Sequence, residues 1–199
     1  KAPETYMEKI STKVNEKNVV DLDYSIKKNI FNLSEYLNKK PENLTACILD
    51  RPRHYEIINE LKSLKVKIKT ITDGDISGAL LVTDDKFEVD IFLGVGGGPE
   101  GVLAAAALKT FNCGFQGRFK FDTDEDKIRA KKMGIKNLTK KYELNEIISG
   151  DSLFCATGIT SGDLVSGIEI NGNEFISETL VTHDSSGLKK VIKLKQKIE

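Results

Sequence analysis

The sequence predicts an α/β fold: a mixed sheet built from β-loop-α units and followed by antiparallel hairpins. Two observations support this. In the first half of the chain, three apolar runs each lead into a polar loop and then into a helical pattern. From Gly167 onward, short apolar strands follow one another with turn residues between them. Successive β-loop-α units favour parallel strands with right-handed crossovers, whereas consecutive short strands favour hairpins.

The first two units lie between residues 46 and 81. A predicted helix over residues 24–37 comes before them, and the first strand is the apolar run 46–49. The helix that follows this strand carries an apolar stripe with i, i+1, i+4, i+7 spacing, made of Ile57, Ile58, Leu61 and Leu64. Such a stripe packs one helix face against a sheet. The second unit is a strand over residues 66–72 and a short helix over 76–81.

The third unit contains the glycine loop Gly94–Gly101, between an apolar strand and an alanine-rich helix over residues 102–108. Glycines allow a ligand to approach the backbone closely, and Pro99 suits the start of a helix. Glu100 then lies where the helix dipole favours an anion, and a carboxylate there could also bind a cation. Taken alone, the segment favours the simpler interpretation, in which Glu100 complements the dipole and the glycines form the turn.

The second half is predicted to contain a strand over residues 113–121 and a helix capped by Asp122 and ended by Gly134. The run 153–156 is predicted to be a buried strand. The segment 157–163 either lines a ligand cleft or forms a polar turn, and a turn is favoured. Two hairpins are expected, with turns at Asn171-Gly172 and at Ser185-Ser186-Gly187.

Composition limits the class of protein. The 199 residues include 30 Lys and Arg and 30 Asp and Glu, so the net charge is zero and a nucleic-acid or membrane surface is disfavoured. No segment looks like a membrane span or a secretory leader, which makes the cytoplasm the expected location. Cys47, Cys113 and Cys155 lie in apolar contexts and are expected to be buried, reduced thiols. No linker is evident, so residues 1–199 are expected to form a single compact unit.

Three polar loops are expected at one edge of the sheet, because ligands collect at the carboxyl ends of parallel strands. Arg51 and Arg53 flank a proline, which restricts them as phosphate recognition requires. Asp73 and Asp75 flank a glycine and could accept hydroxyl hydrogen bonds, bind a divalent cation or form a turn. Each loop alone has a structural explanation, but together the three describe a phosphorylated polyol site beside a metal.

Several motifs resemble those of the class II fructose-1,6-bisphosphatases, a group that includes the bifunctional fructose-1,6/sedoheptulose-1,7-bisphosphatases. The resemblance runs from Ala2 almost to the C-terminus in the order and spacing of that family. The motifs are Asp50-Arg51-Pro52-Arg53-His54, Asp73-Gly74-Asp75, the glycine loop and helix over residues 96–109, and Ala156-Thr157-Gly158-Ile159-Thr160.

This resemblance implies a phosphatase dependent on Mg²⁺ or Mn²⁺ that removes the 1-phosphate of a ketose bisphosphate in gluconeogenesis or the Calvin cycle. It also implies a layered sandwich like that of the inositol monophosphatases, and a homo-oligomer. Glu100 matches a metal ligand. Positions that match substrate-contacting residues are Tyr6, Arg51, Arg53, Asp73, Gly74, Asp75 and Gly97.

The remaining metal ligands of the family, and the threonine that activates water, precede the segment that resembles Tyr6 and have no counterpart in this sequence. We therefore assign no catalytic residue here, and we expect this chain alone to be inactive. One alternative is a noncatalytic module that binds sugar phosphates. A nucleotide-binding Rossmann-like domain is a weaker alternative, because the glycine loop follows the third unit and lacks G-x-G-x-x-G spacing.

Overall fold

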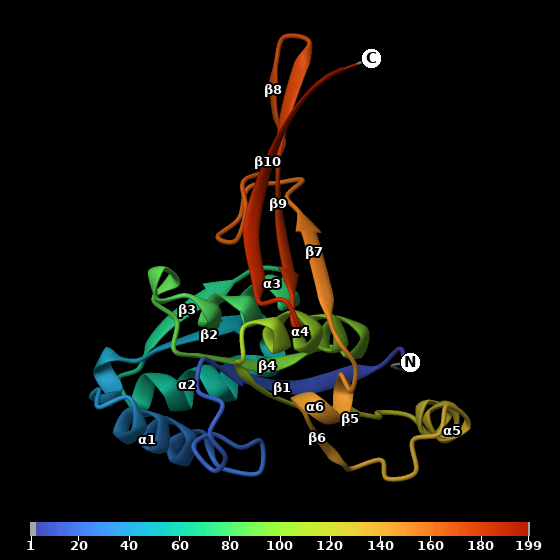
Figure 1. The fold of residues 1–199 in the computed structure, drawn as a ribbon. Helices are drawn as coiled ribbons and strands as arrows, with labels where there is room; N and C mark the ends of the chain where they lie inside the picture. Colours follow the sequence, from blue (N-terminus) through green and yellow to red (C-terminus); the bar gives the residue numbers. More distant parts are fainter. Residues whose placement is uncertain (1–2, 199) are drawn as a thin grey trace.

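A six-stranded mixed sheet forms the centre of the protein in the computed structural model, which describes residues 3–198 (Figure 1). The strand order is β3-β2-β4-β1-β5-β6. The strands are β1 (Tyr6–Thr12), β2 (Thr45–Leu49), β3 (Lys67–Ile71), β4 (Ile91–Gly97), β5 (Gly114–Lys120) and β6 (Lys141–Glu143).

Strands β2, β3 and β4 are parallel, which confirms the three successive β-loop-α units. The sequence analysis did not identify β1 as a strand. It lies in the interior of the sheet, antiparallel to both β4 and β5. Because β1 runs against β4, its first residue, Tyr6, pairs with the last residue of β4, Gly97.

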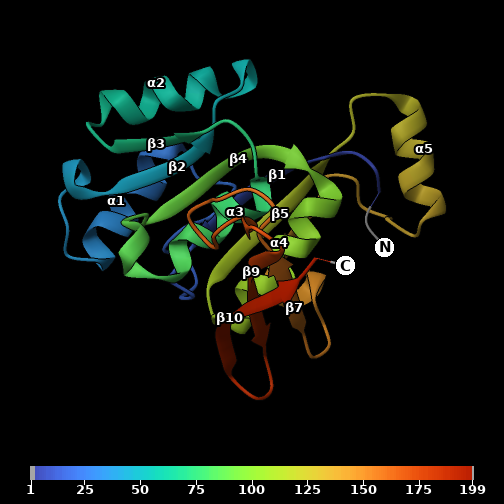
Figure 2. The same cartoon turned by 90° about the horizontal axis from the view of Figure 1, so that it is seen from above.

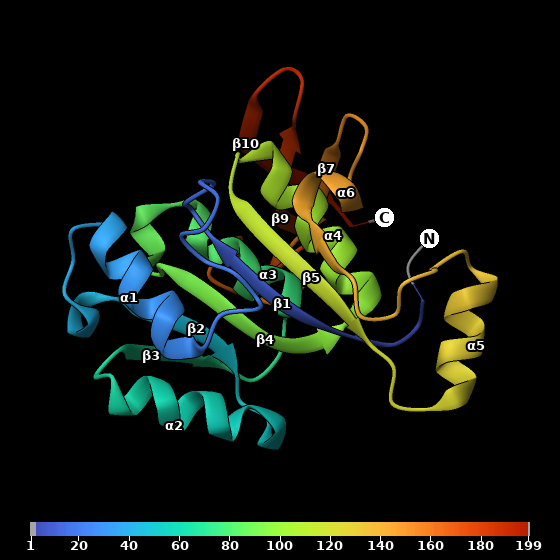
Figure 3. The same ribbon diagram turned by 90° about the horizontal axis from the view of Figure 1, so that it is seen from below.

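Helices cover both faces of this sheet. On one face lie α1 (Ile26–Tyr36), which is capped by the Ser25 hydroxyl, and α2 (Tyr55–Ser63) (Figure 3). On the other face lie α3 (Asp75–Leu80) and α4 (Gly98–Thr110) (Figure 2). These four helices agree with the sequence prediction to within a few residues.

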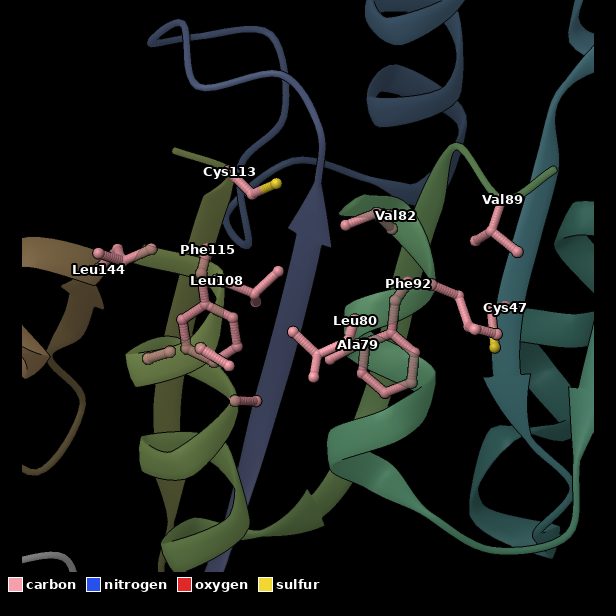
Figure 4. Close-up of a cluster of buried hydrophobic side chains, with 14 of the residues drawn as sticks. Cys47, Ala79, Leu80, Val82, Val89, Phe92, Leu108, Cys113, Phe115 and Leu144 are labelled. Carbon is pink, nitrogen blue, oxygen red and sulfur yellow. The ribbon is translucent and has the colours of Figure 1, made fainter. Parts of the chain in front are cut away.

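Each face of the sheet has its own hydrophobic core. The α3/α4 side is built around Phe92, with Leu80, Leu108 and Phe115 close by (Figure 4). The α1/α2 side contains Ile30, Leu33, Leu61 and Ile91 among its fully buried residues. Burying apolar side chains on both faces is the main stabilising contribution and holds the loops at the sheet edge in place.

Two further helices lie toward the β6 side of the sheet, α5 (Asp124–Lys132) and α6 (Leu144–Ile147) (Figure 3). The α5 cap is Thr123, one residue later than predicted, because Thr123 has the extended backbone of a cap and its hydroxyl accepts from the Asp126 amide at 3.1 Å. Gly134 has φ of +94° just after the helix and ends it as predicted. Short 3₁₀ turns occur at Pro41–Asn43, Pro52–His54, Leu81–Thr83 and Asp85–Phe87.

The hairpins predicted for the second half form a separate sheet instead of extending the first one. Its strands are β7 (Leu153–Thr157), β8 (Glu169–Asn171), β9 (Glu174–His183) and β10 (Leu188–Lys197). Strand β9 pairs antiparallel with the other three. Both predicted turns are present, with Gly172 and Gly187 at positive φ. The sheet starts near α4 and extends away from the main sheet (Figure 1).

The predicted burial of residues 153–156 is wrong. Leu153 is 64% exposed and Cys155 is also exposed, whereas Phe154 packs against the α3/α4 core. The strand is buried on one face only, because the described residues place nothing on the other. Burial is confirmed for Cys47 and Cys113, where it raises the thiol pKa to about 12 and about 11, and all three cysteines are free.

No helix within residues 3–198 is both long enough and apolar enough to span a membrane.

Candidate functional site

The candidate site lies at the edge of the main sheet where β2, β3 and β4 end. Each of these strands leads directly into one of the polar loops singled out in the sequence. Parallel neighbours in the order β3-β2-β4 place all three loops at this edge. Tyr6 joins them because β1 runs in the opposite direction.

Arg53 and Tyr6 form one group at this edge. The Arg53 Nε donates to the Val95 carbonyl at 2.8 Å, and the guanidinium carbon lies 5.2 Å from the centre of the Tyr6 ring. Arg51 donates to the Asp50 carbonyl at 3.0 Å. The Arg53 guanidinium is therefore oriented by a backbone acceptor and by a cation–π contact, and its remaining donors are available to a ligand.

His54 is a structural residue that the sequence analysis did not identify as part of the site. Its ring is fully buried, its Nδ1 donates to the Leu49 carbonyl, and its Nε2 accepts from the Val95 amide, both at 2.8 Å. A Cβ on Gly94 would lie only 3.2 Å from Nε2, so the lack of a side chain on Gly94 leaves room for the ring. The neutral ring thus links the end of β2 to β4 and fixes the loop that carries both arginines.

The free energy of unfolding is expected to decrease as the pH falls below about 6.5. Burial is the main reason that the pKa of His54 lies below its usual value of 6.5. The unfolded chain therefore binds a proton in this range more readily than the folded chain, and acidification favours unfolding. Urea unfolding at several pH values between 7.5 and 5.5 measures this slope, and His54→Gln should have a shallower one. An equal slope in the two proteins would assign the pH dependence to other groups.

Lys9 is the second residue that the sequence analysis missed. Its side chain is 1% exposed, and its ammonium group pairs with Asp75 Oδ2 and donates to the Gly97 carbonyl at 3.0 Å. Burial lowers the pKa of Lys9 to about 8, an effect that the charge of Glu100 opposes and that of Arg53 reinforces. No motif signals this residue, because its partners lie 66 and 88 positions further along the chain.

The two aspartates have different surroundings. Asp73 is exposed, and its Oδ1 accepts from the Gly74 amide at 2.8 Å. Asp75 begins α3, and its side chain is 9% exposed. Its Oδ2 forms an ion pair with the Lys9 ammonium group, while its Oδ1 is buried without a hydrogen-bond partner. Gly74 has φ of +91°, a conformation that glycine adopts without strain. The sequence analysis treated Asp73 and Asp75 as equivalent, but only Asp73 is exposed to solvent.

Glu100 lies in the first turn of α4, as predicted, with Gly97 as the cap of that helix. A Cβ on Gly97 would overlap the Glu100 carboxylate, and a Cβ on Gly96 would overlap that of Asp75. The glycine loop therefore provides the space in which both carboxylates lie against the backbone, in addition to forming the turn.

A cleft of about 930 Å³ opens beside these carboxylates and is lined by Asp73, Gly74, Asp75 and Glu100. Its opposite wall includes residues 153–156 and 160–165. The segment 157–163, for which a turn was favoured over a cleft wall, therefore lines the cleft through residues 160–163. Tyr6, Arg51 and Arg53 do not line it. The predicted residues thus share one sheet edge but form two groups, separated by the end of β4.

The described part of the chain does not fit a complete metal site. Within residues 3–198, no three His, Cys, Asp or Glu side chains come together as a metal ion would require. Asp73, Asp75 and Glu100 all line the cleft without gathering into one cluster, and Asp75 is paired with Lys9.

These features define an α/β protein with polar loops and a cleft at the carboxyl ends of its parallel strands. Residues 1–196 match the family model described as bacterial fructose-1,6-bisphosphatase, glpX-encoded. The chain therefore belongs to the class II fructose-1,6-bisphosphatase family, as the motifs indicated.

Individual relatives agree with this result. The chain is 36% identical over 198 residues to the D-fructose 1,6-bisphosphatase class 2/sedoheptulose 1,7-bisphosphatase of Synechococcus sp. (strain JA-3-3Ab), covering 93% of this chain and 57% of the relative. It is 36% identical over 200 residues to the fructose-1,6-bisphosphatase class 2 of Haemophilus influenzae, covering 94% and 60%. Fructose-1,6-bisphosphatase 1 class 2 of Escherichia coli K12 gives 36% over 199 residues, covering 93% and 59%. The chain thus spans 57–60% of the length of these relatives.

Proposed function

We propose that this chain forms the sugar-phosphate-binding part of a phosphatase that removes the 1-phosphate from fructose 1,6-bisphosphate. The observation that supports the proposal is the gathering of arginines, aspartates and Glu100 around the end of β4, in a chain of this family. Such a site offers positive charge to one end of a ligand and oxygen acceptors to the other. The family also suggests a layered, inositol monophosphatase-like sandwich, which we include in the proposal.

The Arg51 and Arg53 side chains, with Tyr6, would hold the distant 6-phosphate. Arg53 is suited to this because Val95 and Tyr6 already orient it, so little side-chain freedom is lost on binding. Binding energy at the unreactive phosphate would then help to position the reacting end.

Asp73 would accept hydrogen bonds from sugar hydroxyls, because it is exposed at the cleft and carries no counter-charge. Asp75 would contribute through Oδ1, the oxygen that Lys9 leaves unpaired. Gly74 and Gly97 would allow the ligand to approach the backbone. Glu100 would supply one carboxylate to an Mg²⁺ or Mn²⁺ site whose other ligands lie outside residues 3–198. Sedoheptulose 1,7-bisphosphate, named for the Synechococcus relative, is the second candidate substrate.

The chain by itself is expected to bind fructose 1,6-bisphosphate but not to hydrolyse it at a useful rate, even with saturating Mg²⁺ or Mn²⁺. Hard divalent cations take about six oxygen ligands, and this chain offers one carboxylate at the matching position. Calorimetry measures binding, and phosphate release measures turnover. Turnover by the isolated chain would show that other carboxylates here complete a metal site.

The alternative function is a noncatalytic binding module, because the described residues contain no metal cluster. A chimera distinguishes the two. The chain would be joined to the part of the Escherichia coli relative outside the matched region. If the chain is part of an enzyme, the chimera should release phosphate. It should lose this activity with Glu100→Gln but not with Glu125→Gln on α5, because Glu125 does not line the cleft. Binding without turnover in the chimera would favour the noncatalytic module.

A further inference from the structure

Lys9 lies beneath the candidate site and joins two of its loops. It projects from β1, in the interior of the main sheet, and it is buried almost completely. One partner is Asp75, at the start of α3, and the other is the Gly97 carbonyl, at the junction of β4 and α4. A buried ammonium group needs such partners, and here both belong to the proposed site.

The peptide unit between Gly97 and Gly98 is held at both of its polar groups. Its carbonyl accepts from Lys9 at 3.0 Å, and its amide, on Gly98, donates to the Thr5 carbonyl at 2.7 Å. The unit therefore cannot rotate without losing a hydrogen bond in a partly buried place. Because the Glu100 carboxylate lies against Gly97, the orientation of this peptide also determines where Glu100 can lie.

Asp75 is the other group that Lys9 holds. Gly96 leaves the space that the carboxylate occupies, and Lys9 pairs with it where it is almost buried. Oδ1 has no partner in the structure, so a hydroxyl donor from a ligand would satisfy it.

We propose that Lys9 is a positioning residue of the site, whose ammonium group holds the Asp75 carboxylate and the Gly97–Gly98 peptide in the arrangement that binds the sugar phosphate. The identity of the ligand rests on the proposed function; the positioning itself does not. Lys9 does not line the cleft, so its effect on binding passes through these two groups.

The test compares Asp75→Asn with the double variant Lys9→Met/Asp75→Asn, so that any direct contact of Asp75 with the ligand is equally lost in both. Removing the unpaired buried charge should raise the melting temperature of the double variant above that of Asp75→Asn. Affinity for fructose 1,6-bisphosphate should nevertheless fall at least tenfold further, because the Gly97 carbonyl has lost its donor. A change that stabilises the fold yet weakens binding is not expected of a purely structural lysine.

The matched control is Lys13→Met, which removes an exposed lysine just beyond the same strand and should leave affinity unchanged. Hydrogen exchange of the Gly98 amide provides a readout without ligand: the double variant should exchange at least tenfold faster than Asp75→Asn.

Unchanged Gly98 exchange between these two variants would overturn the positioning role. Equal affinity would overturn it as well, by showing that Lys9 only neutralises Asp75. If the unsubstituted chain binds no fructose 1,6-bisphosphate, the proposed function fails, and the Gly98 amide still decides the role of Lys9.

Discussion

Replacing His54 with alanine is expected to destabilise the protein by about 3 to 5 kcal/mol. The substitution leaves a cavity against Gly94 and removes the hydrogen-bond partners of the Leu49 carbonyl and the Val95 amide. Each loss is costly because the ring is fully buried, so that the Leu49 carbonyl and the Val95 amide are left without their partner. Urea unfolding at neutral pH measures the change.

Tyr55→Ala is the matched control for this substitution. Tyr55 follows His54 directly, but its side chain is 52% exposed, so its removal should change the unfolding free energy much less. Similar losses in the two variants would mean that the region tolerates no truncation, and that the His54 ring has no special role in linking β2 to β4.

Arg53→Ala is expected to weaken the binding of fructose 1,6-bisphosphate by roughly 10- to 150-fold, which corresponds to the loss of charge-assisted hydrogen bonds worth about 1.5 to 3 kcal/mol. Arg51→Ala should act in the same direction. Its effect should be smaller, because Arg51 is less well oriented. Within residues 3–198 it contacts no aromatic ring, and it donates to the carbonyl of its neighbour Asp50 and not to β4. Calorimetry gives the affinities, and urea unfolding should show little change since Arg53 is exposed.

Arg129→Ala on α5 is the control for loss of one positive charge. Arg129 is about half exposed, pairs with Asp126 within its own helix and does not line the cleft. It should leave affinity unchanged. If Arg53→Ala instead lowers stability while affinity is preserved, the arginine serves the fold, and the 6-phosphate must be held elsewhere.

The sequence was sufficient to predict the parallel part of the sheet and the edge at which its loops meet. Apolar runs followed by helical stripes identify β2, β3 and β4 and their parallel direction, whereas the strand order β3-β2-β4 was not predicted. The positions of Asp73, Glu100 and Arg53 at that edge are consequences of the same pattern, because each follows the end of a strand.

Burial that depends on distant partners could not be predicted in the same way. In sequence, Lys9 is a polar residue in a strand that no turn signal delimits, and His54 ends the arginine motif without any local pattern that indicates its burial. Their burial depends on Asp75 and Gly94, which only the fold brings to them. Likewise, the short apolar run 153–156 resembles a core strand, but its sheet packs on one side only.

The position of β1 also affects how the chain is made. Synthesis produces this strand well before its partners in the sheet, which among the described residues are 91–97 and 114–120. A nascent chain therefore carries β1 with both hydrogen-bonding edges unpaired until residues 91–97 have been added, and with one edge unpaired until residues 114–120 follow. Such long-range pairing slows folding and leaves strand edges open to incorrect association in the meantime. A chaperone that shields β1 until β4 and β5 have been made should thus increase the yield of folded protein more than it would for a sheet that grows from neighbouring strands.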